Sequence, residues 1–325
     1  MNLNDSISNI GEKELVKIIT TKVKNNFLGD DAAVVDNNFN NLIASSDMLI
    51  QSHHLPKEMN YFQMGFKIVT VNVSDIIAMG ATPKYFLLNI AVFKDLKISQ
   101  FNEIIDGVIS ACEYYNIQLI GGDTDEASEI ILSGTILGYI DKNKEILKYG
   151  FHEGDLLCLT GPLGLSALGF KLLDTDLNGE DVDFFKSKIL NPIARVKEGE
   201  ILKDFATSCT DITDGLSEEL YEMLDANNLN SSLECGFNVY EDKLPLSSDF
   251  IGLVDKLNLD VFDLFFNFGE DFELVFTIPS DCRDELSSLF DFYVIGEVTG
   301  SNGVNFVKSS GSVDVLSRKG YTHLI

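Results

Sequence analysis

Apolar residues recur at helical spacing in two stretches of the chain. In residues 61–79 they fall three or four positions apart and would share one face of a helix: Phe62, Phe66, Val69, Val73, Ile76 and Ile77. Gly80 and Pro83 follow, in the order that is typical of a helix end. The same spacing recurs in residues 100–115, so the pattern predicts a second amphipathic helix there.

Short apolar runs bounded by polar residues or glycine predict strands between and after these helices. In chain order these are residues 41–50, 86–92, 117–122, 130–140, 156–159, 232–237, 272–278 and 293–298. Strands interleaved with helices predict a pair of domains of the α/β and α+β classes. A polar, glycine-punctuated connector spans residues 145–155. We therefore expect a boundary near Gly150, between an N-terminal domain of residues 1–149 and a C-terminal domain of residues 150–325.

Composition and charge limit the partners that this chain can bind. Its 325 residues are 45% hydrophobic, which is enough for a buried core, and 51 acidic against 24 basic residues give a formal net charge of −27. Such a surface repels nucleic acid and anionic membranes, because both are bound mainly through lysine and arginine. No apolar run approaches the roughly 18 residues of a membrane span. A phosphate-bearing ligand would have to be received by metal ions, backbone amides or a few local bases.

The cysteines indicate a reducing environment. There are five, they are widely spaced, and no two form a C-x-x-C pair: Cys112, Cys158, Cys209, Cys235 and Cys282. This pattern argues against a disulfide framework or a zinc site. The first residues lack a basic segment followed by an apolar one, so no signal peptide is predicted and a cytoplasmic protein is expected.

Aspartates stand at turns and helix ends in five separate stretches. They are Asp30 and Asp31, Asp47, Asp75, Asp123, and Asp211 with Asp214. Most have a local explanation as turn or cap residues; Asp214 or Thr213, for example, is a good N-cap for the helix that follows. Asp75 is different, because it lies three residues after Asn72 within an apolar helix, where an unpaired carboxylate is costly to bury. Taken together, the set favours hard divalent cations such as Mg²⁺, which prefer carboxylate oxygens.

Familiar nucleotide-binding motifs are missing. The sequence has no complete Walker A loop, no Rossmann glycine motif that opens a helix, and no protein-kinase motif set. An EF-hand at Asp211 is excluded because Gly215 comes one position too early for the loop glycine. If this chain handles ATP, it does so with a different fold.

Ten short motifs, read together and in order, resemble the thiamine-monophosphate kinase family. This family lies within the superfamily of ATP-binding enzymes that includes aminoimidazole ribonucleotide synthetase. The motifs are GDDAAVV, SSDMLIQSHHL, VNVSDIIAMGATPKYFLLNIAV, IGGDTDEASEI, GDLLCLTGPLG, NPIARVKEG, TDITDGLSEEL, GEDFELVFTIP, VIGEV and KGYTHL. Each motif alone is weak, whereas ten in the order of the family are highly specific.

The resemblance implies a fold and a reaction. The fold is a two-domain α/β plus α+β chain whose N-terminal domains pair into a barrel in a homodimer. The reaction is transfer of the γ-phosphate of ATP to thiamine monophosphate, which gives thiamine diphosphate, with several Mg²⁺ ions. The attacking group is a phosphate oxygen whose second pKa is about 6, so it is mostly ionised at neutral pH and no side-chain base is expected.

The resemblance also implies site residues, position by position. The metal-binding positions are Asp31, Ser45, Ser46, Asp47, Asp75, Asp123, Asp211 and Asp214. The ATP-contacting positions are Gly122, Asp123, Lys148 and Thr213, and the substrate-contacting positions are His54, Glu270 and Arg318. His54 is preferred to His53 on spacing alone.

Some positions depart from the family pattern, and two alternatives stay open. Arg318 stands where a tryptophan is frequent, Lys148 where an arginine often contacts ATP, and Phe268 where a second glycine is usual. One alternative is another enzyme of the superfamily, such as a hydrogenase-maturation ATPase or a selenophosphate synthetase. The latter would need a reactive cysteine near the N-terminus, yet the first cysteine is Cys112. The other is a non-catalytic homologue that binds nucleotide or metal.

Overall fold

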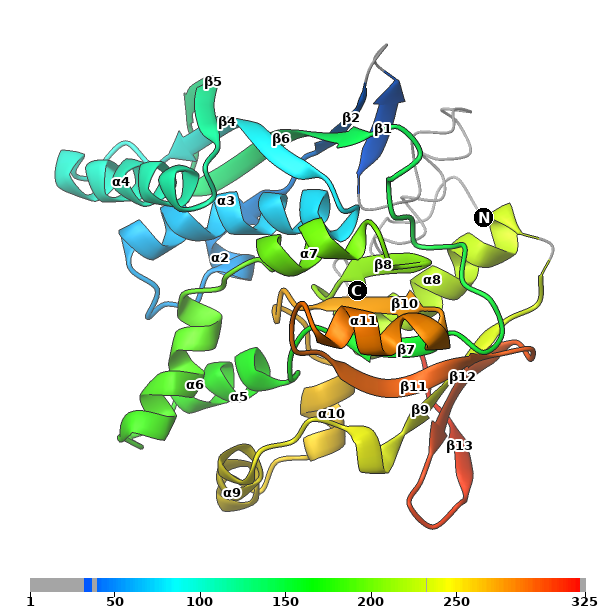
Figure 1. The fold of residues 1–325 in the computed structure, drawn as a ribbon. Coiled ribbons are helices and arrows are strands. Elements are labelled where there is room, and N and C mark those ends of the chain that lie inside the picture. The colour runs from blue at the N-terminus through cyan, green and yellow to red at the C-terminus, as the bar shows by residue number, and fades with distance from the viewer. Residues whose placement is uncertain (1–31, 37–39, 232, 322–325) are drawn as a thin grey trace, which may run out of the picture.

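Two β-sheets follow one another along the chain in the computed structural model, which describes residues 32–36, 40–231 and 233–321 (Figure 1). The first sheet has the order β1-β2-β6-β4-β5, with β3 also paired to β6. Its strands are β1 (Ala33–Asp36), β2 (Asn40–Ser45), β3 (Met48–Ile50), β4 (Thr82–Val92), β5 (Gln118–Glu126) and β6 (Ile131–Asp141). All pairs are antiparallel except β4 with β5.

Helices α3 (Tyr61–Ala78) and α4 (Ile98–Tyr114) cover one face of this sheet, and the short α2 (Gln51–His54) precedes them (Figure 1). Helix α3 begins at a capping box, in which Asn60 accepts from the Gln63 amide and the Gln63 side chain accepts from the Asn60 amide. It ends just before Gly80, whose φ of 72° is the left-handed geometry usual after a helix.

The second sheet has the order β13-β12-β9-β11-β7-β10-β8. Its strands are β7 (Leu156–Leu159), β8 (Ser208–Asp211), β9 (Gly236–Tyr240), β10 (Leu274–Ile278), β11 (Tyr293–Thr299), β12 (Gly303–Val307) and β13 (Val313–Val315). The helices of this half are α5 (Leu165–Leu173), α6 (Glu180–Leu190), α7 (Val196–Leu202), α8 (Leu216–Asn230), α9 (Ser248–Lys256), α10 (Val261–Phe266) and α11 (Arg283–Ser287). Short 3-10 turns, η2 (Glu241–Lys243) and η3 (Ser280–Cys282), precede α9 and α11.

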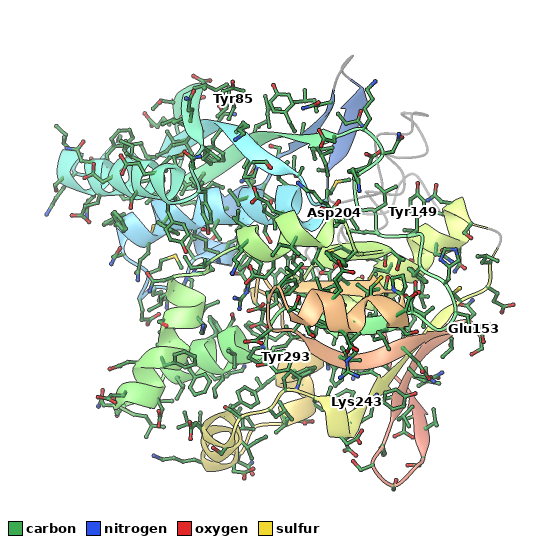
Figure 2. The ribbon with its side chains drawn as sticks, viewed as in Figure 1. Tyr85, Tyr149, Glu153, Asp204, Lys243 and Tyr293 are labelled. Atoms are coloured by element: carbon green, nitrogen blue, oxygen red, sulfur yellow. The ribbon has the colours of Figure 1, made fainter. Side chains whose placement is uncertain are left out.

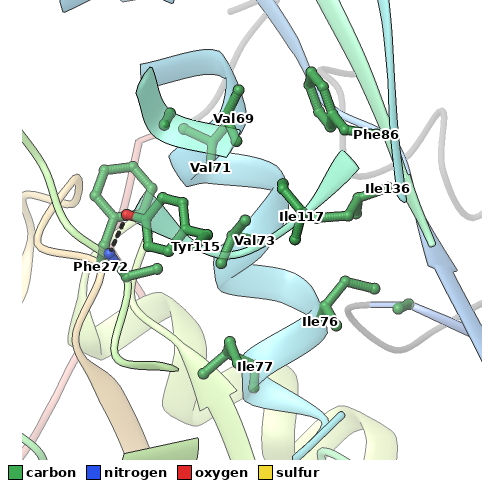
Figure 3. Close-up of a cluster of buried hydrophobic side chains, with 14 of the residues drawn as sticks. Val69, Val71, Val73, Ile76, Ile77, Phe86, Tyr115, Ile117, Ile136 and Phe272 are labelled. Atoms are coloured by element: carbon green, nitrogen blue, oxygen red, sulfur yellow. Dashed lines mark hydrogen bonds between the residues drawn. The ribbon is translucent and has the colours of Figure 1, made fainter. Parts of the chain in front are cut away.

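Helix α3 packs against both sheets, and this contact positions the site. On one side it meets the buried face of the first sheet, through Phe86 and Ile136 (Figure 3). On the other side the same apolar cluster includes Phe272 and residues of β8 and β10. A buried hydrogen bond from the Ala194 amide to the Tyr115 hydroxyl, 3.0 Å long, adds a polar link between the halves (Figure 3).

The structure confirms both predicted helices to within two residues and corrects three local predictions. The strand expected at 41–50 is divided into β2 and β3 around Ser46 and Asp47. The strand expected at 232–237 lies later, at β9, where pairing with β11 and β12 sets its register. Helix α8 has Gly215 as its N-cap with no side-chain cap bond, so the capping role considered for Asp214 or Thr213 is wrong.

The second face of the first sheet has an apolar surface that no described helix covers (Figure 1). Along β6 the buried residues alternate with half-buried ones, as expected when one face packs on a helix and the other does not. The side chains of this open face include Leu42, Ala44, Tyr85, Leu87, Leu137 and Tyr139. Figure 2 shows Tyr85 on this sheet, well above the second half of the chain.

Candidate active site between the two halves

The break between β2 and β3 makes polar contacts with α3 and with β6, where the Ser46 hydroxyl donates to the Gly134 carbonyl at 2.6 Å. The Ser45 hydroxyl donates to a carboxylate oxygen of Asp75, which lies on α3. The Asp47 amide donates to Asn72 Oδ1 at 3.1 Å, and the Asp47 carbonyl accepts from the Gly134 amide at 2.8 Å. Contacts to α3 and to β6 therefore hold the backbone of the break. Two predicted metal-binding residues, Ser45 and Asp75, are hydrogen-bonded to each other.

Asn72 explains why the strand breaks at this point. Its side chain is fully buried, and its Nδ2 donates to the Ile68 carbonyl at 2.8 Å while its Oδ1 accepts from Asp47. A buried amide needs such partners, because an unsatisfied polar group in the core costs on the order of 1–3 kcal/mol. Asn72 is thus a support for the Asp47 backbone, a role that spacing along α3 hinted at but did not reveal.

Across α3 lies the loop that follows β8. Asp211 ends β8 and is only 2% exposed, and Asp214 follows three residues later. Beneath this loop the buried Glu219 of α8 accepts hydrogen bonds from the Asp214 amide at 3.2 Å and from the Thr213 amide at 3.4 Å. Helix α3 contacts both β2 and β8, so the two groups of predicted metal-binding residues flank the same helix.

Carboxylates accumulate around this loop. Burial, followed by the repulsion of Glu222, Asp214 and Asp211, raises the pKa of Glu219 well above its usual range, and Lys148 acts in the opposite direction. The Lys148 ammonium, in a residue that is 8% exposed, donates to Glu222 at 2.9 Å. Four carboxylates near one lysine leave an excess of negative charge that cations would relieve.

The predicted ATP-contacting turn lies on β5. Gly122 has a φ of 151°, and a Cβ there would be 1.6 Å from the Leu88 carbonyl oxygen, so only glycine fits beside β4. Asp123 is exposed, pairs with Asn89 of β4, and accepts from the Thr124 amide at 2.9 Å. In register, Asp123 and Met48 are separated by three strand spacings, or about 14 Å. A single ion could not bridge Asp123 and Asp47 directly.

Two substrate-contacting positions meet at one lysine. Lys67 of α3 has no exposed surface, and its ammonium donates to the His54 carbonyl at 2.9 Å and to the Glu270 carboxylate. Nδ1 of His54 accepts from the Ile50 amide at 2.9 Å and lies 3.3 Å from the Ile50 carbonyl, so the backbone of Ile50 fixes the ring through Nδ1. Glu270 has a φ of 65°, an uncommon conformation for a residue with a side chain.

Arg318 lies away from this pair, against α8. Its guanidinium donates to Glu218 at 2.8 and 3.0 Å and to Asp225 at 2.7 Å, and it lies over the Tyr221 ring. Two carboxylates thus occupy its donors, whereas the sequence predicts a substrate contact at this position. That role stays a prediction.

The donor chemistry fits Mg²⁺, although no single cage is present. Within the described ranges, no three His, Cys, Asp or Glu side chains are grouped so that they could hold a metal ion by themselves. Mg²⁺ characteristically takes one or two carboxylates and completes its shell with water and substrate phosphate, which agrees with carboxylates that are spread over several elements. Asp31, a further predicted ligand, lies outside the described residues.

Sequence reasoning missed two supporting residues, Lys67 and Glu219, and did not identify the partner of a third, Asn72. Each is a buried polar residue on a helix whose partner is distant in sequence or becomes visible only in the fold. For Lys67 the available signal was a lysine on a helix whose neighbouring residues are mostly apolar, since lysine is almost never fully buried without a partner. Among the helices that the structure describes, none is long and apolar enough to cross a membrane.

Comparisons with known proteins place the chain in a family. Residues 29–140 match the model of AIR synthase related protein, N-terminal domain, and residues 152–308 match AIR synthase related protein, C-terminal domain. The chain is 36% identical to a thiamine-monophosphate kinase of Pyrococcus abyssi over 314 residues, which cover 96% of each chain. A protein of the same name from Escherichia coli is 29% identical over 306 residues, with 91% of each chain covered.

Solved structures of thiamine monophosphate kinases also align with this chain over almost its whole length. A structure described as AaThiL complexed with AMPPCP and TMP aligns with a TM-score of 0.90 and 26% identity over 99% of this chain and 100% of that one. A thiamine monophosphate kinase from Aquifex aeolicus aligns with a TM-score of 0.79 and 26% identity, over 99% of each chain. The hydrogenase maturation protein HypE from Escherichia coli shares the fold, with a TM-score of 0.69 at 18% identity over 94% of this chain and 97% of that one.

Proposed function

This chain belongs to the AIR synthase related proteins and, within them, to the thiamine-monophosphate kinases. From that premise we propose that it transfers the γ-phosphate of ATP to thiamine monophosphate. The proposed site lies where α3 meets the β2–β3 break and the loop after β8. The observation that carries the proposal is the agreement along almost the whole chain with a solved complex that contains AMPPCP and TMP. AMPPCP is an ATP analogue whose β–γ bridge is a methylene group, so that complex holds both partners of a phosphoryl transfer.

The proposed reaction does not require a side-chain base. The acceptor is a phosphate monoester with a second pKa of about 6, so at neutral pH its oxygen is mostly deprotonated already. What the protein must supply is alignment of two polyanions and relief of their repulsion. This agrees with a site whose described residues are mainly carboxylates, hydroxyls and backbone amides.

Ser45, Ser46, Asp47, Asp75, Asp123, Asp211 and Asp214 are the described residues that would hold Mg²⁺. When bound, Mg²⁺ neutralises phosphate charge and stabilises the charge that develops on the transferred group. In our proposal Asn72 holds the Asp47 backbone and Glu219 holds the amides of Thr213 and Asp214, so the ligand-bearing segments are fixed before substrate arrives.

We assign the remaining positions by substrate. Gly122, Asp123, Thr213 and Lys148 would contact ATP, with Lys148 exchanging its contact to Glu222 for a phosphate. His54 would contact the acceptor phosphate through its ring, and Glu270 would accept from the thiamine end. Arg318 could approach the substrate only if it left Glu218 or Asp225.

We further propose a homodimer in which the open faces of the two first sheets pair into a barrel, because that face carries apolar side chains such as Leu87, Leu137 and Tyr139. A domain boundary near Gly150 agrees with the start of the second sheet at β7. A cytoplasmic location is supported by the five cysteines, all of which are free thiols.

The test is release of ADP by the purified chain with ATP, Mg²⁺ and thiamine monophosphate, followed by chromatographic identification of thiamine diphosphate. Controls replace thiamine monophosphate with thiamine, which lacks the acceptor phosphate, and add EDTA in excess of Mg²⁺. We expect turnover only in the complete mixture. ADP release that does not depend on thiamine monophosphate would favour another enzyme of the superfamily, and no turnover would favour a binding homologue.

A further inference from the structure

A single buried ammonium joins the two segments that carry the proposed acceptor-substrate contacts. Lys67 is wholly buried in α3, and its Nζ bonds to the His54 carbonyl and to the Glu270 carboxylate, which is 203 residues away in sequence. We propose that Lys67 is a positioning residue for the acceptor substrate, which acts by holding Glu270 and the end of α2 in place. This inference rests on the proposed function and identifies which substrate Lys67 serves.

The backbone around Glu270 is already fixed from other directions. Its amide donates to the Thr213 carbonyl at 2.9 Å, and its carbonyl accepts from the Ser166 hydroxyl at 2.7 Å. Asp271 accepts from the amides of Gly164 and Ser166 at 2.8 and 3.1 Å, which pins the loop to the start of α5. What these contacts leave undetermined is the direction of the Glu270 side chain.

Lys67 sets that direction. The Glu270 side chain keeps 29% of its surface exposed, so one part of its carboxylate contacts the ammonium while another part reaches solvent. In a chain with a net charge of −27, a half-buried carboxylate without a cation would be repelled by its surroundings and would turn outward. Charge-assisted hydrogen bonds are the strongest that a side chain makes, so Lys67 holds this rotamer firmly.

The second contact of Lys67 fixes the other segment. Helix α2 has only four residues and no side-chain cap at its start, so its own hydrogen bonds hold it weakly. Its last residue, His54, is held by its carbonyl to Lys67, and its ring is held by the Ile50 amide. Lys67 thereby sets the distance between the His54 ring and the Glu270 carboxylate. Within the described residues its ammonium bonds to these two segments and not to the β5 turn proposed for ATP.

The test is a double-mutant cycle of Lys67→Met and Glu270→Gln, with KM measured separately for thiamine monophosphate and for ATP. In Lys67→Met we expect the KM for thiamine monophosphate to rise about tenfold or more, the scale of one lost hydrogen bond to a charged group, while the KM for ATP changes less than about twofold. Because Lys67 holds both Glu270 and the end of α2, the double variant should have a higher KM for thiamine monophosphate than Glu270→Gln alone, but a lower one than the product of the two single effects. Lys144→Met, which removes a surface pair with Asp204, is the matched control and should leave both constants unchanged.

Folding is checked by thermal melts, since a half-buried carboxylate that loses its partner can destabilise the chain. If Lys67→Met does not fold, Lys67→Met/Glu270→Gln, which leaves no unpaired charge, is compared with Glu270→Gln alone. A higher KM for thiamine monophosphate in the double variant, with the KM for ATP unchanged, supports the proposal, because the His54 contact is lost as well. Equal KM values for thiamine monophosphate in the two variants overturn it. Equal rises in both KM values for Lys67→Met, or no rise, also overturn it. A wild type without turnover overturns the proposed function and this inference together.

Discussion

Asp211 shows how a single residue can be costly for the fold and necessary for the reaction. It is buried at the end of β8 and adds to the repulsion felt by Glu219. A bound cation would relieve the repulsion between Asp211 and the carboxylates around it.

We therefore predict that Asp211→Asn lowers turnover by more than about 100-fold, as expected for loss of a metal ligand, yet leaves thermal stability in EDTA unchanged or higher. Melting curves in EDTA and rates at saturating Mg²⁺ check both parts. The exposed Asp249 on α9 provides the control, because Asp249→Asn should alter neither quantity. A large loss of stability in EDTA for Asp211→Asn would assign this residue a structural role.

Asp271 makes stability depend on pH. Burial, opposed by hydrogen bonds from Gly164 and Ser166, raises the pKa of Asp271 to about 7. In the unfolded chain the pKa lies near 4, so between these values the folded state binds more protons, and stability falls as pH rises. The contribution is full below about pH 4 and is lost as pH passes about 7, by at most about 4 kcal/mol.

The measurement compares wild type with Asp271→Asn by denaturant unfolding at several pH values. Other carboxylates titrate in both proteins, so the difference between the two curves isolates this group. We expect the wild type to lose stability relative to the variant as pH increases from 5 to 8. A difference that stays constant, or that increases with pH, would contradict the raised pKa.

At the scale of elements, the sequence predicts what local spacing determines. The apolar period of α3 and the glycine after it lie within one stretch, so the helix could be read directly. The division of residues 41–50 into two strands could not be predicted from the sequence. It depends on Asn72 and Gly134, which only the fold brings to Asp47. The motifs likewise gave the acidic positions, whereas Lys67 required knowledge of what lies opposite α3.

The loop that contains Gly269 packs closely against the loop that follows β8, so one added methyl group can test the contact. A Cβ on Gly269 would lie 1.7 Å from the Thr213 carbonyl oxygen and 2.7 Å from the Asp214 amide. We predict that Gly269→Ala displaces the Glu270 loop from the Asp211–Asp214 loop, with a loss of stability of about 1–3 kcal/mol or more and a fall in turnover.

Gly252 is the matched control for this substitution. It lies in α9, and a Cβ there would meet no atom within 4 Å. Gly252→Ala should therefore stabilise the chain by roughly 0.5–1 kcal/mol through helix propensity, with unchanged kinetics. Unfolding curves and initial rates for the pair give the comparison. Similar behaviour of the two variants would mean that the loops separate without cost.

At the scale of the whole molecule, net charge acts on stability. A formal charge of −27 repels itself over long distances, and salt shortens that range from about 30 Å at 0.01 M to about 8 Å at 0.15 M. We predict that the melting temperature in EDTA rises between these two KCl concentrations. A melting temperature that falls over this range would show that attractive ion pairs outweigh the general repulsion.

The open face of the first sheet provides the last test. Leu137 lies on this face, between Ala44 of β2 and Tyr85 of β4, and no described helix covers it. In the proposed dimer Leu137→Lys would place an ammonium against apolar side chains of the second copy, where an unpaired charge is strongly disfavoured. We predict that wild type sediments as a dimer and Leu137→Lys as a monomer at the same concentration. Ile98→Lys, at an 80% exposed position that begins α4, should remain dimeric. The substitution changes the sheet face opposite α3, so the fold is checked by circular dichroism. A Leu137→Lys monomer with the wild-type spectrum has lost dimer pairing but not its fold. A Leu137→Lys dimer would exclude this face as the interface.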